Sequence, residues 1–283
     1  MKKGISRVLL LLFAASLVFL VLVFSFRRPI ERRLFESLFN QNTKEFFDGS
    51  IRLEEARLDP KLKIHLRNLR GQLHSDAGPV PFEISSIDSQ GPLFDFFSKE
   101  GLALIFKGLR PGHSAHQGVQ GTIHLRGGRE GFADLKAEVK SLDLQEVEWL
   151  NPENLSGASG ELRGEVTFRV NAAGEVLCAA NLRVQEPGGR IQSRFFDILK
   201  PYLPQQLEIR QKMDHLIATG GIVGFHDASL QLELAKSDQM KVFLHIAIPD
   251  YNLVLNLNID IRIDEKNAFL QLAQLAGLLK VTQ

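Results

Sequence analysis

The chain has 283 residues and a nearly balanced charge, with 34 Lys and Arg against 33 Asp and Glu. This balance gives no overall field that favours nucleic acid, and no nucleic-acid partner is expected. A single cysteine excludes an intramolecular disulfide and disfavours a thiolate metal site. The aromatic residues are 20 Phe, two Tyr and one Trp, which suits burial or contact with acyl chains.

The amino terminus has the pattern of a membrane anchor. Residues 8–26 are apolar except for Ser16 and Ser25, and a helix of that length rises about 28 Å, close to the hydrocarbon thickness of a bilayer. Basic residues flank this run, and no small-x-small cleavage site follows it: Lys2, Lys3, Arg7, Arg27, Arg28. We therefore expect residues 1–28 to be a cytoplasmic tail and an uncleaved, single-pass transmembrane signal anchor.

The flanking charges are nearly tied, yet a carboxy-terminal domain outside the cytoplasm is the favoured orientation. Because the chain has so few cysteines, a bacterial inner-membrane protein with its main domain in the periplasm fits best. Residues 29–47 place Ile30, Leu34 and Leu38 at helical spacing between charged residues. We expect an amphipathic helix or linker there, either on the membrane surface or against the next domain.

From residue 48 to residue 264 the hydrophobic period changes to two, which predicts β-strands with one apolar and one polar face. Ten to thirteen strands are expected in runs separated by turn residues. Such clean alternation favours antiparallel pairing over a parallel α/β sheet. The runs are 50–59, 61–73, 80–88, 101–111, 118–128, 132–144, 159–170, 175–185, 220–235, 240–248 and 252–264.

A few short helices are expected between the strands, at 92–99, 144–150 and 194–203. Residues 265–283 form a further unit, a C-terminal amphipathic helix with Phe269, Leu272 and Leu275 on one face. The predicted fold is thus mainly β: an N-terminal transmembrane helix followed by a long, curved antiparallel meander. Its shared apolar face must be hidden by closure into a barrel, by folding into a sandwich, or by curling into an open half-pipe or groove.

The strands at 159–170 and 252–264 show the apolar face most clearly, and their residues are the candidate lining of a groove. The alternative for each of them is an ordinary protein core. The candidates are Leu162, Val166, Phe168, Leu253, Leu255, Leu257, Ile259 and Ile261.

The sequence offers no catalytic constellation. None of the motifs G-x-S-x-G, H-E-x-x-H or S-x-x-K occurs, and the glycine pairs near 127 and 188 join strands, unlike a phosphate-binding loop. His113 and His116 are spaced for a metal but lie in a loop without an acidic partner. We expect no enzyme activity, no metal and no cofactor.

Three phrases resemble the AsmA-like proteins and the GspN component of type II secretion: "DGSIRLEEARLDPKLKIHLRNLRGQL", "LSGASGELRGEVTF", and "GGRIQSRFFDILKPYLP" followed by "GGIVGFHDASLQLEL". The resemblance covers residues 28–263. It implies a β-groove that shields lipid acyl chains between two membranes, with no catalytic residue to transfer. The chain departs from the long bridging members in being several times shorter.

The resulting hypothesis is a periplasmic β-groove protein that binds lipid or another amphiphile and assists its transport or envelope biogenesis. The alternative is a non-catalytic scaffold or assembly subunit of an envelope secretion system. Expected partners are membrane lipid or another amphiphile, the inner membrane through the anchor, and either envelope proteins or further copies of the chain.

Overall fold

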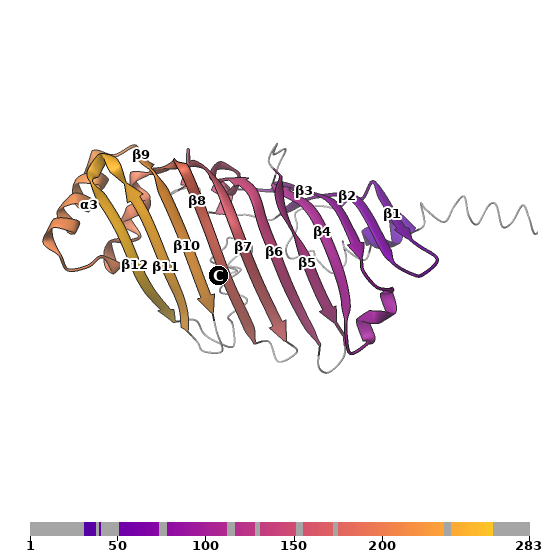
Figure 1. Ribbon diagram of the computed structural model, residues 1–283. Coiled ribbons are helices and arrows are strands. Elements are labelled where there is room, and N and C mark those ends of the chain that lie inside the picture. Colours follow the sequence, from indigo (N-terminus) through magenta and orange to yellow (C-terminus); the bar gives the residue numbers. More distant parts are fainter. Residues whose placement is uncertain are drawn as a thin grey trace, which may run out of the picture.

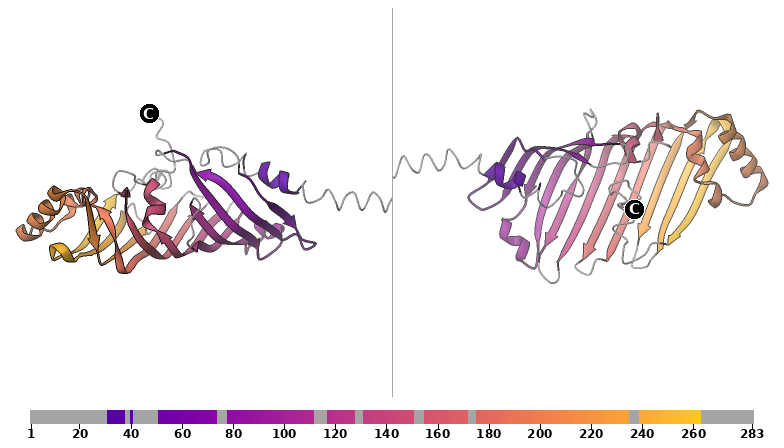
Figure 2. Two further views of the ribbon diagram at one scale, coloured as in Figure 1. Left: turned by 90° about the horizontal axis from the view of Figure 1, so that it is seen from above. Right: turned by 180° about the vertical axis from the view of Figure 1, so that it is seen from behind.

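The computed structural model describes residues 31–37, 40, 51–73, 78–111, 117–127, 131–150, 155–171, 175–234 and 239–262. These residues form one curved, open antiparallel sheet (Figures 1 and 2). Its strand order is β1-β2-β3-β4-β5-β6-β7-β8-β10-β11-β12, with β9 paired to the second half of β8. The predicted mainly-β, antiparallel, curved meander is therefore confirmed for this part of the chain.

Nearly every strand pairs with its neighbour in sequence, because the connections are short and the alternation gives each strand one apolar face to align with the next. The strands are β1 Glu55–Leu58, β2 Ile64–Leu73, β3 Val80–Ser89, β4 Leu102–Pro111, β5 Gly118–Arg126, β6 Phe132–Asp143, β7 Ser159–Asn171, β8 Val176–Gln192, β9 Ile222–Phe225, β10 Asp227–Leu234, β11 Gln239–Ile248 and β12 Leu253–Arg262.

The predicted short helices are present as tighter 3₁₀ turns. They are η1 Leu93–Phe97, η2 Leu144–Leu150, η3 Ser193–Asp197 and η4 Lys200–Tyr202, with a further turn η5 Pro249–Tyr251. The predicted single helix over 194–203 was wrong in extent, because it consists of two turns joined at Ile198 and Leu199. Pro201 lacks the backbone N–H that a continuous helix would need at that position.

Helix α3, Leu207–Thr219, was not predicted. Its signal is present in the sequence: Ile209, Met213, Leu216 and Ile217 repeat at helical spacing, and Gly220 follows the last residue with φ 67°. Met213 and Leu216 are fully buried against the sheet. The helix covers the end of the apolar face formed by β9–β12 (Figure 1).

A second helical segment, residues 31–37, protects the first edge of the sheet. Its Glu36 accepts a hydrogen bond from the Leu53 amide at 2.9 Å, and Glu31 accepts one from the Leu58 amide at 3.2 Å. The nearby Asn40 side chain accepts from the Ile51 amide at 2.7 Å. These side chains accept hydrogen bonds from edge amides that could otherwise pair with another strand, so they protect the β1 edge against pairing.

Among the described residues, no helix has the length and the apolar character that crossing a membrane requires. The predicted anchor (1–28) and C-terminal helix (265–283) lie outside the described residues. The helical segment 31–37 falls within the predicted 29–47, and the strands fall within the predicted 48–264, but the domain boundaries themselves stay predictions.

Candidate functional site

One face of the sheet is apolar from the first strand to the last. The pairing register aligns one residue from each strand into a continuous row, here called the apolar row. Its members, each opposite the next, are Ala56, Leu66, Ile87, Phe106, Gly121, Ala137, Val166, Ala180, Leu232, Val242 and Ile259. Ten inter-strand spacings of about 4.8 Å give the row a length of about 48 Å.

The two ends of the apolar row are ordinary core. At the first end, Leu66, Ile87 and Phe106 belong to a buried cluster that also holds Leu53 and contacts Phe35 of the helical segment 31–37. At the other end the buried cluster joins β9, β11 and β12 to η3 and α3. Helical cover at both ends therefore lies on the apolar face of the sheet (Figure 2).

The middle of the row differs in both exposure and size. The six members from Gly121 to Val242 are all partly exposed, whereas the flanking Phe106 and Ile259 are 4% and 6% exposed. Four consecutive members are small: Gly121, Ala137, Val166 and Ala180. Small side chains project less far from a curved sheet than large ones, so they leave space above its apolar surface. An elongated apolar ligand needs such a space.

The eight predicted lining residues divide between these two environments. Leu162, Val166 and Phe168 on β7 are partly exposed in the middle of the face. Leu253, Leu255, Leu257 and Ile259 are buried in the cluster with α3, so in this structure protein contacts them. The Ile261 side chain lies outside the described part of the structure.

Gly164, next to Val166 on the same face of β7, has φ 147°, a backbone conformation that L side chains rarely adopt. A Cβ atom added to it would lie 2.0 Å from the Asn181 carbonyl oxygen of β8. This position therefore requires glycine, and β6, β7 and β8 approach one another without a side chain there.

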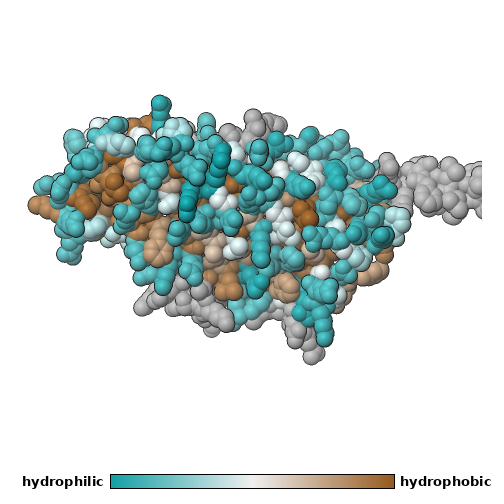
Figure 3. Space-filling model, in the orientation of Figure 1, coloured by the Kyte–Doolittle hydropathy of each residue, from teal (hydrophilic) through white to brown (hydrophobic). Residues whose placement is uncertain are grey.

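The opposite face of the sheet is polar. Figure 3 shows it as mostly hydrophilic over the strands, with hydrophobic residues gathered at the end formed by α3. Its charges neutralise one another in pairs, as Arg163 does with Glu161 at 2.7 Å. His245 lies on this face and contacts Asn256 at 2.8 Å and Asp227 at 3.1 Å.

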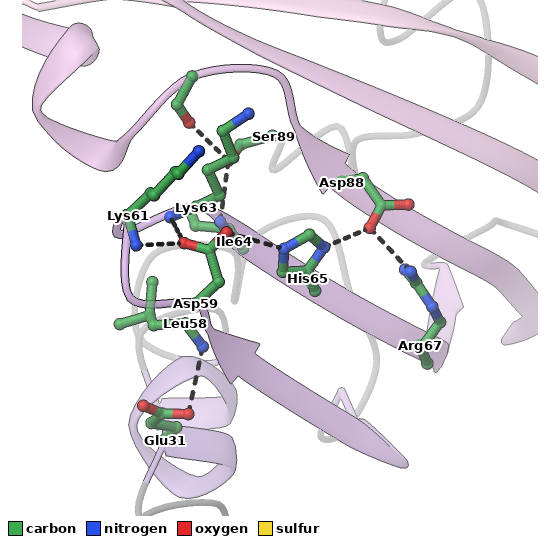
Figure 4. Close-up of polar contacts among 11 residues, drawn as sticks. Glu31, Leu58, Asp59, Lys61, Lys63, Ile64, His65, Arg67, Asp88 and Ser89 are labelled. Atoms are coloured by element: carbon green, nitrogen blue, oxygen red, sulfur yellow. Dashed lines mark hydrogen bonds and ion pairs between the residues drawn. The ribbon is translucent and has the colours of Figure 1, made fainter.

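A cluster of connected polar side chains lies at the first end of the sheet (Figure 4). His65 Nδ1 is 2.8 Å from Asp88 Oδ1, the same oxygen that accepts a 2.8 Å hydrogen bond from Arg67. The other ring nitrogen of His65 is 3.8 Å from Asp59. Asp59 in turn accepts from the backbone amides of Lys61 and Lys63, at 2.8 and 2.9 Å.

These contacts shift both carboxyl groups towards ionisation. The backbone hydrogen bond from Lys63 is the main cause that lowers the pKa of Asp59. For Asp88, burial raises the pKa, but the hydrogen bonds from Arg67 and His65 together outweigh burial and lower it. Ionised Asp59 thus caps the amides of the β1–β2 turn, and ionised Asp88 joins β3 to His65 and Arg67 of β2.

A histidine beside a carboxylate could also orient a nucleophile, but this cluster has none in reach. The nearby Ser89 is buried, accepts from the Ile64 amide at 2.8 Å and donates to the Gly91 carbonyl at 2.7 Å, so its hydroxyl is occupied by the backbone. Within the described residues, no group of three or more His, Cys, Asp and Glu could hold a metal ion. His113 and His116 lie outside these residues.

Cys178 lies on the apolar face, opposite Phe168, and is partly exposed. Burial among apolar neighbours raises the pKa of its thiol, so it is a poor nucleophile at neutral pH.

No protein-family model, curated protein or solved structure matches the chain.

Proposed function

We propose that this is a membrane-anchored, periplasm-facing β-groove protein that binds the acyl chains of lipid or another amphiphile and assists their movement through a bacterial envelope. The observation that carries the proposal is the exposure along the apolar row. The row is buried by protein at both ends but partly exposed across its six middle members, on the side of the sheet where the face is apolar.

The energetic case is passive binding. Burying an acyl methylene stabilises a complex by about 0.8 kcal/mol, so about ten methylenes against the middle of the face contribute about 8 kcal/mol. That offsets much of the cost of withdrawing one chain from a bilayer. A row about 48 Å long at 4.8 Å per strand covers only part of an envelope-wide path, so partners or further copies would complete it.

A photo-crosslinking residue placed at Phe168 in the full chain, in bacterial cells, tests the proposal. The control is the same residue at Phe243, which is 40% exposed on the opposite face. We expect phospholipid or another amphiphile on the protein after irradiation at position 168, and none at 243. Equal labelling at the two positions, or no lipid at 168, would refute the groove.

Two adjacent alanines supply a second, matched pair. Ala180 lies in the apolar row and Ala179 points to the opposite face, where it is exposed. Ala180→Phe raises the floor of the groove and should reduce lipid crosslinking at position 168 several-fold. Ala179→Phe adds the same bulk outside and should leave it unchanged.

A second candidate function, a scaffold subunit of a secretion system, is favoured by one observation. Large apolar side chains are exposed at the α3 end: Ile198, Tyr202, Leu207 and Ile222. Crosslinks from Leu207 to another envelope protein, together with no lipid at position 168, would favour this function over lipid binding.

A further inference from the structure

The turn η1 presents apolar side chains to solvent at the end of the sheet where the chain leaves its predicted membrane span. Phe97 is 77% and Phe94 67% exposed, among the highest values for large apolar side chains in the described structure. Leu93 of the same turn and Leu62 of the β1–β2 turn are also exposed. These four residues are here called the apolar tip.

Packing and hydrogen bonds join the tip to the body of the sheet. Between the two outward rings, Phe96 packs into the first core cluster, stands edge-on to Phe97 with centroids 5.0 Å apart, and accepts a hydrogen bond from the Gly127 amide at 2.8 Å. The Leu93 amide donates to the Leu62 carbonyl at 2.9 Å, which joins the two parts of the tip. Two phenylalanine rings directed to solvent beside two exposed leucines form an apolar patch, and such patches typically mark a site of contact with protein or membrane.

The short connection after the predicted membrane span limits how far the tip can lie from the membrane. Only four residues, 27–30, lie between Phe26, the end of the predicted span, and Glu31, and the five steps at about 3.6 Å each reach at most about 18 Å. Glu31 bonds the Leu58 amide at 3.2 Å, and the turn after Leu58 contains Leu62. Figure 4 shows Glu31, Leu58 and the turn side by side, and Figure 1 places η1, between β3 and β4, at this same end.

The polar surroundings fit a bilayer surface. Lys61 and Lys99 are exposed beside the tip, and Lys63 is partly exposed. Long basic side chains next to exposed Phe and Leu are typical of segments that enter the headgroup region, where the rings lie below the phosphates and the ammonium groups near them.

We infer that the apolar tip inserts into the phospholipid bilayer that holds the anchor, and so seats the first end of the apolar face on that membrane. This inference rests on the anchor of the proposed function, and it deepens that function by naming the part of the domain that meets the membrane.

The experiment uses the full chain in nanodiscs of phosphatidylethanolamine and phosphatidylglycerol. In a Cys178→Ser background, Phe97→Cys carries an environment-sensitive fluorophore, and Phe94→Cys is a second reporter position. Both side chains are more than half exposed, so labelling removes little core packing, and an unchanged thermal unfolding midpoint confirms the fold. Phe243→Cys, on the polar face, is the control.

Doxyl-labelled lipid should quench the fluorophore at 97 and at 94 at least twofold more than at 243. Quenching at 97 no greater than at 243 overturns the inference. A fluorophore whose emission is blue-shifted but which doxyl lipid fails to quench also overturns it, because protein and not lipid would then cover the tip. A label at Phe168→Cys reports separately on the groove: quenching at 97 without quenching at 168 would support the tip and count against the groove, whereas the reverse would overturn only the tip.

Discussion

Two Leu→Ala substitutions on the same face of the sheet distinguish a groove from a continuous core. Leu255 on β12 is 1% exposed and packs in the cluster that contains α3, whereas Leu182 on β8 is partly exposed near the middle of the face. The two substitutions remove identical atoms, so the difference in their cost measures the environment alone.

The expected magnitudes follow from this difference in burial. Leu→Ala at a fully buried site costs about 2–5 kcal/mol, because the transfer free energy is lost and a cavity remains. At Leu182 part of the side chain already contacts water and solvent can fill the space, so we expect about 1 kcal/mol. The predicted gap is thus about 2 kcal/mol or more in the free energy of unfolding.

Urea unfolding of the full chain in mild detergent, followed by circular dichroism in the far ultraviolet, measures both values. A repeat with added phospholipid serves as a check, because ligand bound to the middle of the face should raise the stability of the wild type more than that of Leu182→Ala. Equal costs of about 3 kcal/mol at both sites would mean that protein covers the whole face, and the groove hypothesis would fail.

Three further outcomes are expected. Gly164→Ala should lower the free energy of unfolding by about 1–3 kcal/mol, because its φ of 147° and the Asn181 carbonyl leave no room for Cβ; a neutral result in urea unfolding would contradict that geometry. Asp88→Asn should lower the free energy of unfolding at pH 7 and make that free energy depend less on pH in acid. The reason is that folding lowers the pKa of this carboxyl, so its ionised form contributes stability above the unfolded pKa near 3.8. That contribution is lost as the pH falls through the pKa of the folded state. Unfolding midpoints from pH 7 to pH 2.5 test this, and parallel curves for both proteins would count against it. The thiol of Cys178 should react with maleimide more slowly than the thiol of the unfolded protein, and bound lipid should slow this reaction further. Because burial raises the pKa of the thiol, the reaction rate should continue to rise above pH 9.0. A titration midpoint at or below 9.0 would show that burial does not raise this pKa.

The strand plan could be read from the sequence because it depends on local alternation. In β7 every second residue from Leu162 to Val170 is apolar or glycine, and the intervening residues carry charges or hydroxyls. A one-residue shift in register would turn all of them to the wrong face, so the alternation constrains the register in which β7 can pair. Helix α3 lies beyond the helix predicted at 194–203, although Met213 and Leu216 of α3 stand at helical spacing in the sequence.

The candidate site was predicted only in part. Leu162, Val166 and Phe168 and the four described members of the β12 set have the same alternating pattern, yet the first three are partly exposed and Leu253 to Ile259 are buried. The alternation alone does not distinguish them, because the burial of the β12 set comes from α3 and η3, which fold back over one end of the sheet.

The alternation in the sequence predicts strands with one apolar face and favours antiparallel pairing, but the same pattern fits a barrel, a sandwich or an open half-pipe. Only the tertiary structure decided which part of that face is core and which part stays partly open. Burial depends on what packs against a residue from elsewhere in the chain: Phe106 and Ile259 belong to buried clusters that include helical residues, whereas Ala137, Val166 and Ala180 between them stay partly exposed.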